Sequence, residues 1–217
     1  MKGLIIKDFI NMKKNFKILS AIALLYGFMA FIMENAGYFN SMFTLVFAML
    51  TLSAYSLDEM AKWEGYALTM PISKNDVVQG KYLFMLMLTF VGLAINSGLA
   101  VLINIVTKAE RVTAGVGGSA LGAAIVILFY SISIPIITKY GVEKSRFIII
   151  AIYMLPFLAG AGIFKLLKQR FPEPPLVLVR ILSFLLDYIY LIVPVVVLLS
   201  LLISYLISIR IYRKKEF

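Results

Sequence analysis

The sequence contains no cysteine and no histidine, and acidic residues are few, with 11 Asp and Glu against 21 Lys and Arg in 217 residues. The absence of these two residue types excludes disulfides, thiol nucleophiles, imidazole acid/base chemistry and Cys/His metal sites. Apolar residues dominate instead: 62% of the chain is hydrophobic, 15% is charged and the mean hydropathy is +0.96. Soluble domains do not reach such values, so the composition predicts an integral membrane protein.

Six long runs lack Asp, Glu, Lys and Arg, and a helix needs about 20 apolar residues to cross about 30 Å of hydrocarbon. These runs predict an all-α fold with a single transmembrane domain over 1–217. The predicted spans are 18–33, 38–57, 82–106, 114–138, 147–164 and 188–209. No convincing small-x-small cleavage site precedes Tyr38, so the first span is expected to be retained rather than removed as a signal peptide.

The distribution of basic residues predicts the orientation. Fifteen Lys and Arg fall in the segments 1–17, 58–81, 139–146 and 210–217, and six fall in 107–113 and 165–187. Because basic residues concentrate in cytoplasmic segments, both termini are predicted to lie in the cytoplasm.

An amphipathic helix is predicted over 1–17, lying in the cytoplasmic interface with its lysines near anionic head groups; a solvated basic tail is the alternative. Its apolar side comprises Ile5, Phe9, Met12 and Phe16, and its polar side Lys7, Asn11, Lys13 and Lys14. In 165–187, a proline-rich break is followed by an apolar stretch too short to cross. This segment is predicted to be an external re-entrant or interfacial helix, the alternative being an extension of the last span.

The sequence lacks the residues that ion-coupled transport and ATP hydrolysis require. None of the six runs holds an ionisable side chain of the kind that couples transport to protons or sodium, which disfavours a self-powered secondary transporter. The only Gly-Lys pair, Gly80-Lys81, is followed by Tyr82, so there is no P-loop and the chain cannot hydrolyse ATP alone. We expect no catalytic residue, no bound cofactor and no metal site. The net charge of +10 reflects orientation and contact with membrane lipid, so no nucleic-acid partner is expected.

Small residues line the fourth predicted span. Gly118 and Gly122 form a G-x-x-x-G pair, and Gly115, Ser119 and Ala123 form a stripe of small residues. Such faces let helices approach closely, and packing within one subunit and packing in a dimer are equally open.

The segment 58–81 differs from the rest of the chain because it holds four of the 11 acidic residues and the only tryptophan. Two capping boxes, Ser56 with Glu59 and Ser73 with Asp76, predict one helix that starts near Leu57 and another that starts at Ser73. Pro71 is expected to end the first helix. The side chains expected on one side of that helix are Met60, Trp63 and Ala67, and those on the other are Asp58, Glu59 and Lys62.

Charge favours a protein partner for this segment. Residues 58–81 carry a net charge of −1, whereas residues 1–17 carry +4. A cytoplasmic segment that rests on anionic lipid should be basic, and this one is not. Trp63 and Tyr66 are residue types enriched at the centres of protein interfaces. The alternative is that they anchor at the membrane interface while the hairpin packs on its own subunit.

One motif carries a family resemblance. It consists of Asp58-Glu59, Trp63, Tyr66-Ala-Leu68, Pro71-Ile-Ser-Lys74, Val78 and Lys81-Tyr82, set between the second and third of six spans. This pattern resembles the bacterial type-2 ATP-binding-cassette (ABC) permeases. It is most similar to the small-permease branch that includes the exporter of phenol-soluble modulin peptides.

The resemblance implies a permease subunit of an ABC exporter in the bacterial plasma membrane, moving an amphipathic peptide, lipid or drug out of the cell. It also implies a permease homodimer or heterodimer with two copies of a cytoplasmic ABC ATPase, which binds the ATP and magnesium. Segment 58–81 would be the coupling helix, and its expected ATPase contacts are Asp58, Glu59, Lys62, Trp63, Tyr66, Pro71, Ser73 and Lys74. The alternative is a non-transporting membrane scaffold or immunity protein that recruits a cytoplasmic partner through the same loop.

Overall fold

The computed structural model describes residues 2–32, 49–67, 69–107, 112–170, 180, 183–184 and 187–215. Within these ranges every regular element is helical, which confirms the all-α prediction for this part of the chain. The helices are α1 (Lys2–Asn11), α2 (Lys13–Ile32), α4 (Trp63–Ala67), α5 (Lys74–Thr107), α6 (Val112–Tyr140), α7 (Val142–Arg170) and α9 (Ile189–Lys214), together with a helix over residues 49–60.

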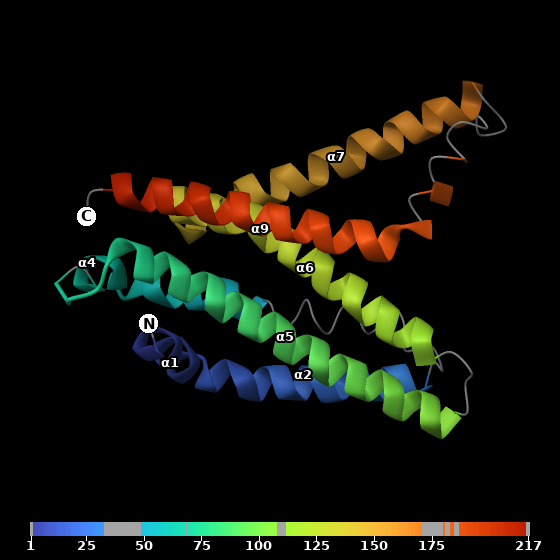
Figure 1. Ribbon diagram of the computed structural model, residues 1–217, viewed down its shortest axis with the longest axis horizontal. Helices are drawn as coiled ribbons and strands as arrows, with labels where there is room; N and C mark the ends of the chain where they lie inside the picture. Colours follow the sequence, from blue (N-terminus) through green and yellow to red (C-terminus); the bar gives the residue numbers. More distant parts are fainter. Residues whose placement is uncertain are drawn as a thin grey trace.

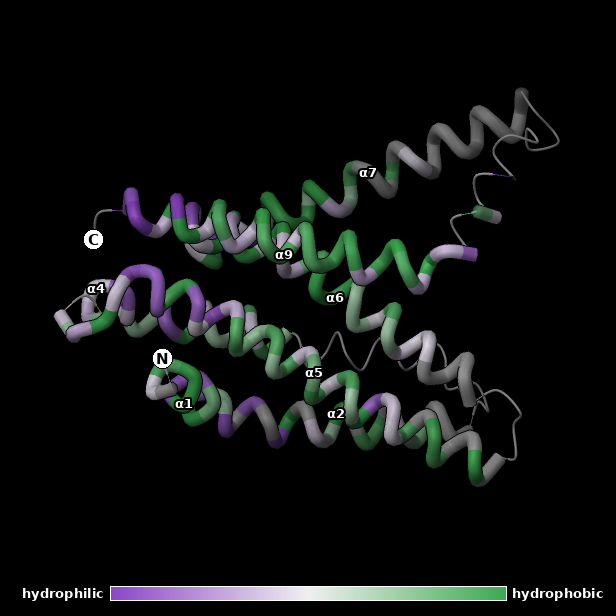
Figure 2. The backbone as a smooth tube through the Cα atoms, in the orientation of Figure 1, coloured by the Kyte–Doolittle hydropathy of each residue, from purple (hydrophilic) through white to green (hydrophobic). Residues whose placement is uncertain are grey.

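Three stretches in the described ranges are long and apolar enough to cross a membrane. They are Lys74–Leu99 in α5, Gly117–Tyr140 in α6 and Ile189–Lys214, which is the whole of α9. Hydrophobic residues run along these helices, and hydrophilic residues gather toward one end (Figure 2). Predicted spans 18–33 and 147–164 are helical in α2 and α7 where described, and residues 38–48 lie outside the described ranges. The six-span topology stays a prediction.

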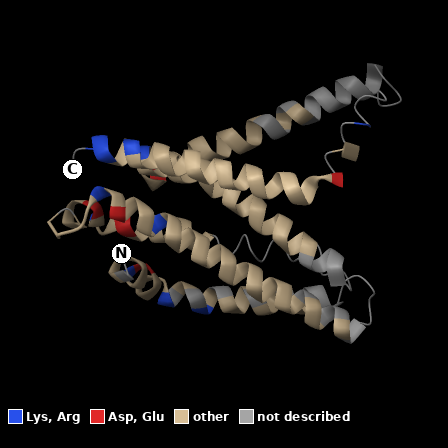
Figure 3. Cartoon of the chain, viewed as in Figure 1, with Lys and Arg blue, Asp and Glu red and all other residues tan. Residues whose placement is uncertain are grey.

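The helices α5, α6 and α9 pack against one another, with α7 against α6 and α1 against α5. One end of the bundle brings together α1, α4 and the C-terminal end of α9 (Figure 1). Most of the charged residues coloured in Figure 3 lie at this end, which is called the charged end below. The two terminal helices therefore meet the 58–81 segment in space.

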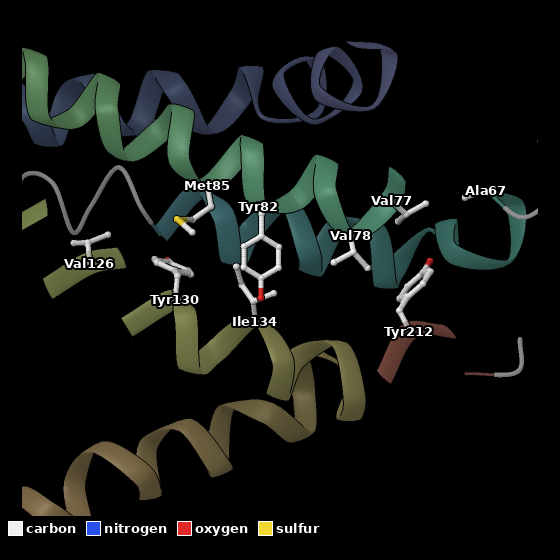
Figure 4. Close-up of a cluster of buried hydrophobic side chains, with 9 residues drawn as sticks. All are labelled: Ala67, Val77, Val78, Tyr82, Met85, Val126, Tyr130, Ile134 and Tyr212. Atoms are coloured by element: carbon white, nitrogen blue, oxygen red, sulfur yellow. The ribbon is translucent and has the colours of Figure 1, made fainter. Parts of the chain in front are cut away.

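Two apolar clusters hold the bundle together at and near the charged end. The first joins α4, α5, α6 and α9 (Figure 4), and its buried members are Ala67, Val77, Val78, Tyr82, Met85, Val126, Tyr130, Ile134 and Tyr212. The second joins α1, the 49–60 helix and α5, and its buried members are Met12, Leu50, Ala54, Phe84 and Leu88. Between α5 and α9 the Tyr82 hydroxyl lies 2.6 Å from Ser204 Oγ and 2.8 Å from Ser208 Oγ. These buried polar groups satisfy one another, as a membrane interior requires.

The predicted helix over 1–17 is divided in the structure. α1 ends at Asn11 and α2 begins at Lys13, with Met12 between them. The side of the predicted helix that was expected to face lipid packs inward. Met12 is fully buried, and the Phe9 ring lies edge-on to the Phe84 ring with 5.2 Å between the ring centroids. The large apolar residues that α1 exposes are Ile6 and Ile10, one turn apart. The difference arises because α5 and the 49–60 helix offer α1 an apolar surface of their own chain, which periodicity alone does not reveal.

The predicted external segment begins inside a helix. Its first residues, 165–170, continue α7, and residues 171–179, 181–182 and 185–186 lie outside the described ranges. The re-entrant helix therefore stays a prediction. Asp187 is exposed and lies just before α9.

The small residues of α6 differ in burial and in the residues they contact. Ser119 and Ala123 are buried, so this part of the stripe packs within the subunit. A Cβ at Gly117 would come 2.8 Å from the Tyr190 hydroxyl, so a side chain there would displace the Tyr190 ring. A Cβ at Gly118 would meet nothing within 4 Å, and Gly122 is buried. The predicted packing role of Gly118 and Gly122 stays a prediction.

Candidate functional site

The start of α5 follows the second capping box, which the structure confirms. The Asp76 backbone N–H donates to Ser73 Oγ at 3.1 Å, and the Ser73 backbone N–H donates to Asp76 Oδ2 at 3.1 Å. The Ser73 hydroxyl also donates to Asp76 Oδ2 at 2.7 Å. These bonds satisfy donors at the helix start, so the exit from the 58–81 segment into α5 has a defined direction.

The first capping box was interpreted wrongly. The 49–60 helix runs through Ser56 and Leu57 without a start, because apolar residues such as Leu50 and Ala54 pack it as one continuous helix. A residue inside a helix has no free helix N-terminus to cap. The Glu59 carboxylate instead accepts the backbone N–H of Val142, at the start of α7.

A turn separates the end of the 49–60 helix from α4. Lys62 adopts a left-handed backbone with φ of 50°, and its N–H donates to the Glu59 carbonyl at 3.1 Å. Met60 and Ala67 were expected on one side of a single helix, but Met60 is 79% exposed and Ala67 is 1% exposed. The left-handed turn redirects α4, so helical periodicity does not continue across it.

Four charged side chains form what we call the ionic cluster, comprising Lys7 and Asp8 of α1, Asp58 of the 49–60 helix and Lys81 of α5. Lys7 Nζ lies 2.7 Å from Asp58 Oδ1 and 3.1 Å from Asp8 Oδ1. Lys81 Nζ lies 2.6 Å from Asp58 Oδ2 and 3.1 Å from Asp8 Oδ2. Each ammonium group thus contacts both carboxylates, and the two charges of each sign balance.

Burial makes this balance important. Asp8 is 3% exposed, Asp58 6% and Lys81 7%, so these groups have little access to water. A buried charge without a partner carries a large desolvation cost, and an ion pair with good geometry offsets it. Lys7 also lies over the Trp63 ring, 4.3 Å from its centroid, which connects the cluster to α4.

Glu59 connects the 49–60 helix to the turn between α6 and α7. Gly141 forms this turn with φ of +78°, and a Cβ there would come 2.7 Å from Glu59 Oε1. The left-handed backbone favours glycine here, and a side chain at this position would displace the Glu59 carboxylate. A carboxylate at the N-terminus of α7 is also favoured by the helix dipole.

The C-terminal end of α9 holds the other side of the 58–81 segment. Lys215 Nζ lies 2.7 Å from Glu64 Oε2 in α4. Lys74 Nζ donates to the carbonyl oxygens of Arg213 at 3.3 Å and Lys215 at 3.0 Å. Because a helix C-terminus presents unsatisfied carbonyls and partial negative charge, a lysine is a favourable partner there. The 58–81 segment is thus anchored to α9 as well as to α1, α5 and α7.

A cavity of about 450 Å³ lies among these contacts at the charged end. Its lining includes Asp58, Glu59, Trp63, Gly141 and Tyr212, so the ionic cluster, α4, the α6–α7 turn and α9 all border it. The indole N–H of Trp63 is buried and has no acceptor among the described residues. Within the described ranges no group of three or more acidic side chains is arranged to hold a metal ion.

The predicted partner contacts differ in accessibility. Asp58 is buried in the ionic cluster, and Trp63 and Lys74 are half-buried. The exposed positions are Glu59, Lys62, Tyr66, Pro71 and Ser73, with Tyr66 at 59%. Their contact with an ATPase stays a prediction.

Sequence reasoning missed Lys7, Asp8, Lys81 and Gly141 as parts of the site. One signal was available for Asp8, which is the only acidic residue among five lysines in 1–17.

The fold and the site together define an integral membrane protein whose charged end presents a short exposed helix on a firmly held base. The family model for the ABC-2 family transporter protein matches residues 3–213, so the chain belongs to this family. It is therefore the membrane permease component of an ABC transporter, a class that associates with an ABC ATPase subunit. Comparisons with curated proteins and with solved structures give no match.

Proposed function

We propose that the chain is the permease subunit of an ABC exporter in the bacterial plasma membrane, of the branch resembling the phenol-soluble modulin exporter. It moves an amphipathic peptide, lipid or drug outward, with ATP and magnesium bound and ATP hydrolysed by the partner ATPase. The 58–81 segment serves as the coupling element that docks on this ATPase. The family membership supports the partner class, and the charged end supports the docking surface.

The observation that carries this proposal is the exposure of large side chains beside a buried base. Met60 is 79% exposed and Tyr66 is 59% exposed, while Ala67 of the same segment is 1% exposed. Tyrosine and methionine are enriched in interface centres, where they supply much of the contact area. The end of the 49–60 helix and α4 thus expose one such residue each in a charged region, which fits a protein partner.

The anchoring of the segment supports a coupling role. Asp58 joins it to α1 and α5, Glu59 to α7, and Glu64 and Lys74 to the end of α9. A displacement of α4 by the ATPase would therefore reach several helices at once. A loop held only by its ends would absorb such a displacement instead.

The assembly and the cargo follow from the same proposal. A permease dimer, as a homodimer or heterodimer, would engage two copies of the ATPase, and the open surface at Gly118 supports a helix contact between subunits. The six predicted spans contain no charged residue, which suits a cargo with a large apolar part that enters laterally from the membrane.

The test uses the exposed residues, because Glu59 and Trp63 also hold the chain together and their loss would confuse docking with folding. Tyr66→Ala and Met60→Asp are expected to reduce co-purification of the partner ABC ATPase. Tyr188→Ala is the matched control, since Tyr188 is 51% exposed and precedes α9 at the end away from the charged end. If both docking variants retain the ATPase as the control does, the proposed docking surface is wrong.

A second measurement separates the exporter from the scaffold alternative. Peptides, lipids and drugs are added to the complex reconstituted in lipid vesicles, and ATP turnover is followed. An exporter should show turnover that responds to a cargo and that is lost in Tyr66→Ala. An ATPase that binds but responds to no cargo favours the scaffold.

A further inference from the structure

Asp58 and Glu59 are consecutive residues, yet their carboxylates contact opposite neighbours. Asp58 contacts Lys7 of α1 and Lys81 of α5. Glu59 accepts the N–H of Val142 at the start of α7. Successive side chains on a helix point about 100° apart. The last turn of the 49–60 helix can therefore contact α1 and α5 through Asp58 and the start of α7 through Glu59.

We propose that Asp58 and Glu59 form a two-sided latch that closes the charged end of the permease. The Asp58 side ties the 49–60 helix to α1 and α5, and the Glu59 side ties it to the α6–α7 turn. The cavity of about 450 Å³ is bordered by both sides of the latch, including Lys81, Gly141 and Val142. Opening the Glu59 side lets the α6–α7 turn move away from the end of the 49–60 helix and widens this cavity.

The two sides differ in strength, which sets the order of opening. On the Asp58 side, four charges balance one another and three of the groups are buried. On the Glu59 side, an exposed carboxylate accepts one backbone N–H. Charges that face water are easier to separate than charges that must leave a buried cluster. The Glu59 side therefore releases first, while the Asp58 side stays closed.

The α6–α7 turn is shaped for this contact. Gly141 has φ of +78°, and a Cβ at this position would lie 2.7 Å from Glu59 Oε1 and 3.3 Å from Glu59 Cδ. The absence of a side chain thus creates the space that the carboxylate fills. A side chain at residue 141 would displace the carboxylate from this place.

The use of the latch in transport rests on the proposed function. The latch itself is a property of the permease chain and is measured without the ATPase. Because the natural chain has no cysteine, pairs of nitroxide labels can be introduced at chosen sites without background.

The experiment places two label pairs on the full chain in lipid vesicles and measures distances by pulsed electron resonance. The first pair, Met60→Cys with Lys144→Cys, spans the Glu59 side, and both positions are exposed. The second pair, Met60→Cys with Ile10→Cys, spans the Asp58 side, and Ile10 is 65% exposed. Glu59→Ala should shift the first pair to longer distances and leave the second unchanged.

Two further variants keep the test decisive. Gly141→Ala drives a Cβ against the carboxylate and should shift the first pair as Glu59→Ala does, and the double variant should shift it no further. Glu59→Asp retains the charge but shortens the reach to Val142. If Glu59→Ala fails to fold, Glu59→Asp takes its place and should shift the first pair in the same direction. An unchanged first pair, or an equal shift of both pairs, overturns the latch.

These outcomes are distinct from those of the docking test. If the first pair shifts but Tyr66→Ala still binds the ATPase, the latch stands and the proposed docking fails. If Tyr66→Ala loses the ATPase but Glu59→Ala leaves the first pair unchanged, the docking stands and the latch fails.

Discussion

Asp58→Asn removes one of two carboxylates from the ionic cluster and leaves two ammonium groups facing Asp8 alone. The Lys81 side chain is only 8% exposed and cannot reach water without moving α5. The Lys7 side chain is 20% exposed and can partly relax. Breaking a buried ion pair by removing one partner costs about 3 to 5 kcal/mol. Because Lys7 has partial access to water, we expect the lower end, about 3 kcal/mol.

A second substitution should restore part of this loss. Adding Lys7→Met to Asp58→Asn returns the cluster to neutrality, because Asp8 and Lys81 remain in contact at 3.1 Å. Methionine keeps an unbranched side chain that reaches to Cε, with sulfur in place of the Cδ methylene, and it lacks the ammonium group. The double variant should therefore be less destabilised than the sum of the two single variants, by about 2 kcal/mol.

The assay is thermal unfolding of the purified chain, followed by the fluorescence of Trp63, the only tryptophan. A chain of this length changes its Tm by about 2 to 4 °C per kcal/mol, so Asp58→Asn should lower Tm by about 6 to 12 °C. Lys144→Met, at an exposed lysine, is the control and should change stability by no more than about 0.5 kcal/mol. Additive single variants, or an Asp58→Asn protein as stable as the wild type, would refute the reasoning.

Three other substitutions test single contacts. Tyr82→Phe leaves Ser204 and Ser208 without the shared hydroxyl and should cost about 1 to 3 kcal/mol in a thermal unfolding experiment. Ser73→Ala removes the cap of α5 and should speed amide hydrogen exchange in its first turn, with no change in the middle of the helix. Trp63→Phe removes a buried N–H that has no acceptor among the described residues, so Tm measured by circular dichroism should hold or rise, whereas Trp63→Ala should lower it.

The two capping boxes show which parts of the fold the sequence could predict. Ser73 and Asp76 lie three residues apart, and their hydrogen bonds depend on nothing more distant. Ser56 and Glu59 have the same spacing, but apolar packing around residues 50–54 carries the helix straight through them. A local pattern thus predicts a helix start correctly only when no tertiary contact continues the preceding helix.

The site depended on contacts that no local pattern encodes. Lys7 and Asp58 are 51 residues apart, and Asp8 and Lys81 are 73 apart. Periodicity placed Lys7 on a polar side, which is correct for a helix in isolation but does not identify its partner. The unusual composition of 58–81 did mark the segment, because four acidic residues and a tryptophan stand out in an apolar chain.

The distribution of contacts limits where motion can occur in this permease. Within the bundle, α5, α6 and α9 share buried apolar side chains such as Tyr130 and Ile134, so separating them would expose a large area. The part-buried hydrogen bond from Val142 to Glu59 is worth roughly 1 kcal/mol, whereas the Asp58 side costs about 3 kcal/mol to break. A partner that pulls on α4 can supply the free energy needed to break the Glu59 hydrogen bond from a modest change in its own contacts. The response should therefore begin at the Glu59 contact and leave the packing of α5, α6 and α9 intact.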